Sequence, residues 1–199
     1  MFDDLIVEIE PPSNRQGKCV GDKEQHLTEA AVMLAYALHL LVTETGLTKV
    51  EIHPDGEHGK RFEIGNWLSL RGFTLLSRTG STNYCGTYLR DGQIVLVSSI
   101  PGQGDVVAHT SRGTTLAECK GGVINTRHSG QLSRLRKGLC EAVGLLMSRP
   151  KIGRQVAVVP DTETTRALAL KLAPRAREAG IDIALVNGLG EVTDIIGQG

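Results

Sequence analysis

Residues 104–120 have the sequence GDVVAHTSRGTTLAECK, and this stretch decides the fold that we expect. It contains two mainly apolar runs, 105–109 and 115–120, each of a length typical of strands. The turn-forming pair Arg112-Gly113 lies between them. The stretch therefore predicts a β-hairpin, in which two antiparallel strands are joined by a short turn.

The polar residues of this hairpin stand where they can meet. Because side chains alternate along a strand, Glu118 and Lys120 point the same way and Cys119 points the opposite way. Asp105 lies on the neighbouring strand, so two carboxylates and one ammonium group can converge at one edge of a sheet. Mg²⁺ prefers oxygen ligands and accepts phosphate oxygens, and a lysine beside it can orient the attacking water or offset negative charge. The trio therefore suits hydrolysis of a phosphodiester.

The segments around the hairpin show both strand and helix patterns, which indicates an α/β domain. In chain order we expect strand 49–53, helix 60–71, strand 73–77, an irregular segment 79–92, strand 94–98, helix 129–148, strand 156–159, helix 162–179 and strand 181–186. The last three elements form a β-α-β unit, whose strands are parallel if they share a sheet. We expect the glycine-containing tail 188–199 to be loose.

Residues 1–48 are interpreted as an N-terminal addition to this domain. A short strand ends at a Pro-Pro pair, and Asp22 with Gln25 forms a plausible capping pair for a long helix, 22–45. Apolar residues follow at helical spacing, which predicts that the helix packs on the core or against a second copy of the chain. Residues 49–199 are assigned to the α/β core.

The composition is that of an ordinary globular protein. Of the 199 residues, 40% are hydrophobic and 22% are charged, which argues against disorder. No apolar run approaches the roughly 20 residues that a membrane-spanning helix needs. The acidic N-terminus lacks the basic region of a signal peptide, so we expect a cytoplasmic protein with no membrane contact. The four cysteines form no C-x-x-C pair, and the sequence predicts no zinc or disulfide framework.

The charge of the chain is balanced, with 22 Lys and Arg against 22 Asp and Glu, so no global field attracts nucleic acid. Any such binding must depend on a local patch. Polar and basic residues gather after the hairpin, at Arg127, His128, Gln131, Arg134 and Lys137. These side chains either contact phosphates beside the carboxylates or form the solvated basic face of a helix.

The order Asp, a turn, then Glu-x-Lys on successive strands resembles the PD-(D/E)XK signature of restriction endonucleases, Mrr-type enzymes and archaeal Holliday-junction resolvases. The core of that family runs helix, three strands, helix, strand, and the chain offers this order from about 60 to 159. The resemblance implies that Asp105 and Glu118 hold a metal ion and that Lys120 positions or activates water. In many members the first helix supplies a further acidic residue, a position that Glu63 matches.

Two features of the chain depart from the family pattern. Gly104, rather than proline, precedes Asp105, and an insertion at 79–99 separates the first strand from the hairpin. Gln131 lies near the start of the following helix, where some branches of the family place a functional glutamine. The resemblance further implies a restriction-endonuclease-like mixed sheet flanked by helices.

The activity that this resemblance implies is endonucleolytic cleavage of DNA in restriction, repair or defence, with Mg²⁺ as the cofactor and Mn²⁺ as a substitute. Cleavage of both strands needs two active centres, so we expect a homodimer, within a larger defence or repair complex if the role requires one. One alternative is a catalytically inactive nucleic-acid-binding or assembly module with the same fold. Another is a small α/β enzyme that acts on a nucleotide or other phosphoester, although the chain has no phosphate-cradling glycine loop.

Overall fold

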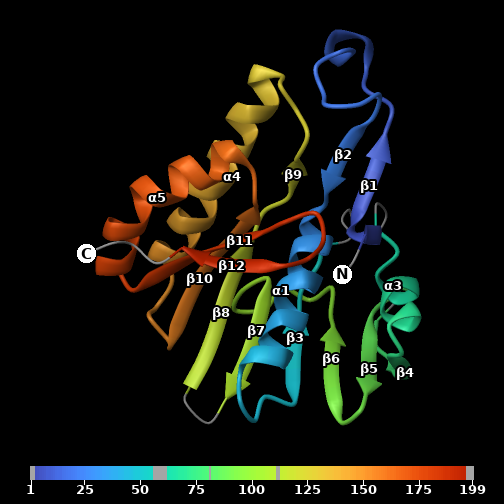
Figure 1. Ribbon diagram of the computed structural model, residues 1–199. Coiled ribbons are helices and arrows are strands. Elements are labelled where there is room, and N and C mark those ends of the chain that lie inside the picture. Colours follow the sequence, from blue (N-terminus) through green and yellow to red (C-terminus); the bar gives the residue numbers. More distant parts are fainter. Residues whose placement is uncertain (1–2, 56–61, 81, 111–112, 196–199) are drawn as a thin grey trace.

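The computed structural model describes residues 3–55, 62–80, 82–110 and 113–195 of the chain. Within these ranges a mixed sheet of nine strands forms the centre of an α/β fold, flanked by helices (Figure 1). Its strands are β3 (Lys49–Ile52), β4 (Thr74–Arg78), β5 (Gly86–Arg90), β6 (Gln93–Val97), β7 (Val106–Thr110), β8 (Gly113–Cys119), β10 (Arg154–Pro160), β11 (Ile181–Val186) and β12 (Val192–Ile195). Across the sheet they follow the order β12-β11-β10-β8-β7-β3-β6-β5-β4.

The remaining described elements complete a second sheet and the helical layers. The second sheet is antiparallel, with the order β1 (Ile6–Ile9), β2 (Glu24–Leu27) and β9 (Gly122–Val123). The helices are α1 (Glu29–Thr43), α3 (Ile64–Leu70), α4 (Ser129–Ser148) and α5 (Glu163–Glu178), with 3-10 turns at Asp3–Leu5 and Ser13–Arg15. None of the helices in the described ranges is both long and apolar enough to cross a bilayer.

The expected hairpin is β7 and β8, which pair antiparallel with Val106 opposite Ala117. Strand β10 runs parallel to β8 and also to β11, which confirms the parallel β-α-β unit. Strand β3 pairs antiparallel with β7, so the three strands β3, β7 and β8 form a meander, with β10 added in parallel beyond it. The expected α/β class with a mixed sheet and flanking helices is confirmed; residues 111–112 of the turn lie outside the described ranges.

Helix α1 is buried on almost every side. Its residues from Ala30 to Ala37 are at most 1% exposed, as expected for a helix that is apolar all round. They belong to one hydrophobic cluster with the inward-facing residues of β3, β6, β7, β8, β10 and β11. The helix therefore fills one face of the sheet, which leaves little of its apolar surface for a second copy of the chain.

The expected start of this helix at residue 22 is wrong. Residues 24–27 form strand β2, and the helix is capped by Thr28, whose hydroxyl accepts a hydrogen bond from the backbone N–H of Ala31. The pair Asp22 and Gln25 resembles a capping pair locally, but pairing of β2 with β1 and β9 takes precedence over that preference.

Helices α4 and α5 cover the other face of the sheet. The stripe Leu139, Ala142 and Leu146 of α4 packs with Ala157 and Val159 of β10 in a separate hydrophobic cluster. Alternate residues of β10 thus face opposite layers, because side chains alternate along a strand. Helix α4 has the bounds expected from the sequence, 129–148.

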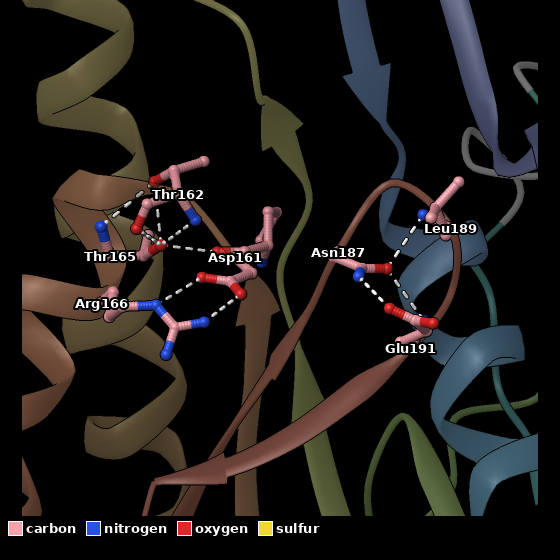
Figure 2. A network of polar contacts seen from close by, with 8 residues as sticks. Asp161, Thr162, Thr165, Arg166, Asn187, Leu189 and Glu191 are labelled. Carbon is pink, nitrogen blue, oxygen red and sulfur yellow. Dashed lines mark hydrogen bonds and ion pairs between the residues drawn. The ribbon is translucent and has the colours of Figure 1, made fainter.

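Two polar networks fix the ends of β10 and β11, and Figure 2 shows both. At the start of α5, the side chains of Thr162 and Thr165 cap the helix reciprocally, and Arg166 pairs with Asp161. In the turn after β11, Asn187 Oδ1 accepts hydrogen bonds from the backbone N–H groups of Leu189 and Glu191, each at 2.9 Å.

Two segments expected to be irregular contain strands instead. The tail after Gly188 includes β12, which pairs antiparallel with β11, so the expectation of a loose tail is wrong for residues up to 195; residues 196–199 lie outside the described ranges. The segment 79–92 includes β5, which pairs with β4 and β6. Helix α3 begins at Ile64, while residues 60 and 61 of the expected helix are not described.

Candidate active site

Asp105 and Glu118 lie opposite each other where β7 begins and β8 ends. The backbone N–H of Asp105 donates to the carbonyl of Ala117 at 2.9 Å, which continues the register of the hairpin. In return, the backbone N–H of Cys119 donates to Oδ2 of Asp105 at 2.7 Å. These two bonds hold the Asp105 carboxylate beside the end of β8, on the strand next to Glu118.

Glu118 is a deeply buried carboxylate with a cationic partner. The residue is 2% exposed, and its Oε1 lies 2.7 Å from Nη2 of Arg149, which directly follows α4. Burial raises the pKa of Glu118 and the negative charge of Asp105 raises it further, while Arg149 opposes both effects. The two carboxylates therefore repel each other, and a positive charge is needed between or beside them.

Lys120 lies two residues beyond Glu118 on the same face of the strand. Its Nζ stands 3.6 Å from Oε1 of Glu29 and 3.4 Å from Oε1 of Glu141. Burial alone would lower the pKa of Lys120, but the nearby carboxylates of Glu29, Glu141 and Asp105 raise it above its ordinary value. The lysine is therefore an ammonium group at neutral pH, which suits orienting water or offsetting charge better than accepting a proton.

Glu29 is the residue of this cluster that the sequence interpretation missed. It is the first residue of α1, and its side chain is 17% exposed. Burial, opposed by Lys120 and reinforced by Asp105 and Asp55, raises the pKa of Glu29 to about 7. In the sequence, Thr28-Glu29 directly precedes an apolar run, which is a signal for the start of a helix and not for a contact with Lys120.

The structure does not bring Glu63 into this group. Glu63 is exposed and immediately precedes the short helix α3, which packs against β4. Strand β4 forms the edge of the sheet, four strands beyond β7 in the sheet order. The expectation that Glu63 supplies the acid of the first helix fails because the helix that reaches the hairpin is α1.

The residues fit a hard divalent cation by the chemistry of their donors. Among the described residues, no three His, Cys, Asp or Glu side chains already form a metal site. The negative charge of Asp105 nevertheless raises the pKa of both Glu118 and Glu29. A divalent cation would relieve this repulsion between carboxylates. Asp105 and Glu118 are the pair best placed to hold such an ion.

A groove of about 630 Å³ adjoins the cluster, between the β1–β2 ribbon, the first residues of α1 and the start of α4. In Figure 1, β1 and β2 stand beyond the end of β8, near β9. The groove is lined by Val7, Ile9, Arg15, His26, Leu27, Thr28, Glu29, Gly121, Gly122, Val123, Gln131 and Arg134. Two of these residues adjoin Lys120, because Gly121 follows it in the chain and Glu29 lies 3.6 Å from its Nζ; Asp105, Glu118 and Lys120 themselves are not among the lining residues.

The residues expected to contact nucleic acid fall into two groups. Gln131, which is buried, and Arg134, which is exposed, line the groove. Arg127 is exposed and His128 half-buried on the loop before α4, and Lys137 is exposed on the helix, but none of the three lines the groove.

The N-terminal ribbon adds two basic residues that the sequence interpretation did not assign to the site. Arg15 and His26 line the groove and pair with the buried carboxylate of Glu24, at 2.7 and 3.1 Å. Neither residue shows a functional spacing in the sequence, because they are brought together only when β2 pairs with β1 and β9.

Comparisons of the chain with family models, with curated proteins and with solved structures give no match. The function is therefore argued from the geometry of the site.

Proposed function

We propose that the chain is a divalent-metal-dependent endonuclease of the PD-(D/E)XK type that hydrolyses phosphodiester bonds in DNA. The observation that carries this proposal is the placement of Asp105 opposite Glu118, with Lys120 two residues farther along the same face. Two oxygen-donor groups and one ammonium at the end of a hairpin are the groups that such hydrolysis requires.

The order of the elements around the site supports the proposal. Counted from Glu29, the chain runs α1, then β3, β7 and β8 as an antiparallel meander, then α4, then β10 parallel to β8. This is the helix, three strands, helix, strand order of the family, with α3 to β6 as an insertion between the first and second strands. In this assignment Glu29, not Glu63, holds the position of the acidic residue in the first helix.

Each residue of the cluster has a separate role in the proposed reaction. Asp105 and Glu118 would hold the ion, and the ammonium of Lys120 would orient the attacking water and offset charge on the phosphate. Glu29 and Glu141 fix the position of Lys120, at 3.6 and 3.4 Å from its Nζ. A bound Mg²⁺, or Mn²⁺ in its place, would supply a water of lowered pKa and stabilise the negative charge that develops on the phosphate.

The groove is the surface that we propose for the nucleic acid. Arg134 can pair with a backbone phosphate, and Gln131 lies deeper in the same groove. Because the chain is neutral overall, binding depends on local cations such as Arg134 and weakens with added salt. A second copy of the chain, and any larger complex, would contact surfaces other than the buried helix α1.

One observation favours a second candidate, an inactive nucleic-acid-binding module with this fold. Arg149 already neutralises Glu118 in the structure, as a permanent structural ion pair would. In that case the groove would bind nucleic acid without cleaving it.

Cleavage assays separate the two candidates. Purified protein is incubated with plasmid, linear, single-stranded and branched DNA, and with RNA, in the presence of Mg²⁺, Mn²⁺ or EDTA. The wild type is compared with Asp105→Asn and Lys120→Ala, and with Lys171→Ala, an exposed lysine of α5, as the matched control. Metal-dependent cutting that both site variants lose and the control keeps supports the nuclease. DNA binding without cutting by wild type supports the binding module, and equal cutting by all variants indicates a contaminant.

A further inference from the structure

Arg149 pairs with the proposed metal ligand Glu118, yet the proposed chemistry gives it no role. Its Nη2 lies 2.7 Å from Oε1 of Glu118, and the Glu118 side chain is 3% exposed. A carboxylate at this depth needs a positive partner, because an isolated buried charge is costly. Arg149 supplies that charge from a position just past the end of α4.

The guanidinium is only partly used by this contact. Arginine carries five N–H donors in a rigid fork, and a structural arginine commonly engages a carboxylate through two of them. Here Nη1 is buried and has no hydrogen-bond partner within the described residues. It faces the backbone at Gly104, where a β-carbon would lie 3.6 Å from it. Arg149 is thus held at Glu118 by charge rather than by a complete hydrogen-bonded fork.

Open space lies next to the guanidinium. A hollow of about 310 Å³ is lined by Gly102, Gln103, Leu116, Arg149, Pro150 and Ile152. It is bounded on one side by the loop that leads into Asp105 and on the other by the segment that follows α4. Arg149 can therefore change its side-chain torsions toward this hollow without displacing a strand.

We propose that Arg149 is an internal counterion that takes the place of the divalent cation on Glu118, and that it turns into the adjoining hollow once the ion is bound. This inference rests on the proposed function. Two cations on one carboxylate repel each other, so the guanidinium and the ion compete for Glu118.

Calorimetric titration with Mn²⁺, without DNA, tests the competition. We expect Arg149→Gln to bind Mn²⁺ about tenfold more tightly than wild type, since the ion no longer has to displace a paired guanidinium. Arg175→Gln, an exposed arginine in the last turn of α5, should bind Mn²⁺ and cleave DNA like wild type. A purely structural role for Arg149 would leave the Mn²⁺ affinity unchanged or weaken it, and that result overturns the inference.

The titration also distinguishes failure of this inference from failure of the proposed function. If wild type binds Mn²⁺ and Asp105→Asn does not, the metal site stands, and the affinity of Arg149→Gln alone decides the role of Arg149. If wild type and Asp105→Asn both fail to bind, the metal site is refuted and the inference with it.

A second measurement applies if Arg149→Gln does not fold. In wild type labelled with ¹⁵N-arginine, the Nε resonance of Arg149 is assigned by its absence from Arg149→Lys. Titration with Mg²⁺ should shift this resonance and leave that of Arg175 in place. An Arg149 resonance that does not move while Mg²⁺ binds overturns the inference.

Discussion

A single methyl group at Gly121 is expected to push the start of α1 away from the end of β8. Gly121 follows Lys120, and the first turn of α1 lies directly against it. A β-carbon at this position would lie 2.5 Å from the backbone nitrogen of Glu29 and 2.6 Å from the carbonyl oxygen of Leu27. Both contacts are with backbone, so no side-chain rotation relieves them.

The size of the effect follows from these distances. Ordinary contact begins at 3.4 Å, so the start of α1 must move by about 0.9 Å, the difference between 3.4 and 2.5 Å. Overpacking of this kind costs about 1–3 kcal/mol. In a chain of 199 residues this lowers Tm by roughly 3–10 °C. Because the same movement carries Glu29 away from Lys120, we also expect cleavage to slow by about a hundredfold.

Gly144→Ala provides the matched control for Gly121→Ala. Gly144 is exposed in the second half of α4, and a β-carbon there would meet no atom within 4 Å. The same substitution should therefore stabilise the protein by about 0.5–1 kcal/mol, through helix propensity alone. Thermal unfolding followed by circular dichroism, with cleavage assays on both variants, measures the two effects. A Gly121→Ala protein with the Tm and the activity of wild type would refute the packing argument.

Three further predictions follow from the site and the fold. Lys120→Ala should lower kcat for DNA by about 10²–10³-fold with little change in DNA affinity, because its ammonium acts on the reacting group; single-turnover kinetics and filter binding measure the two quantities. In the folded protein the pKa of Glu29 is about 7, above its ordinary value of 4.5, so the folded state binds the proton more tightly than the unfolded state does. Ionisation of Glu29 therefore lowers the stability of the protein as the pH rises from 4.5 through 7. Glu29→Gln should therefore match wild type near pH 4.5 and exceed it above pH 7 by up to about 3 kcal/mol; urea unfolding in EDTA checks this, and a gain at low pH instead would contradict it. Thr162→Ala removes the cap of α5 and should lower the free energy of unfolding, measured in urea, by about 1 kcal/mol. Thr164→Ala, at a position between the two capping threonines, should lower it by less.

The parts of the fold that the sequence predicts well have a strong local period. The hairpin strands β7 and β8 and the helix α4 carry their pattern within a few residues, so their existence and order are evident in advance. Strand β12 lacks such a pattern, because a strand at the edge of a sheet buries few side chains, and only its pairing with β11 identifies it.

The residues of the candidate site also divide into those that a local pattern predicts and those that it does not. Asp105, Glu118 and Lys120 are separated by few residues and one turn, so strand alternation is sufficient to bring them together. Glu29 and Arg149 come from parts of the chain about 90 and 30 residues away from Glu118, and nothing in their own neighbourhood points to it. Long-range packing of α1 and α4 on the sheet places them there, which a local pattern cannot reveal.

The burial of α1 has a consequence for how the chain is made. On the ribosome this helix is synthesised long before most of the surface that shields it, since β7, β8, β10 and β11 come at least 60 residues later than its last turn. Until then this apolar segment of 15 residues remains exposed to solvent, where it can bind chaperones or associate with other copies of itself. Fragments that stop short of β10 should accumulate as aggregates, whereas the whole chain sequesters the helix in one late, cooperative step.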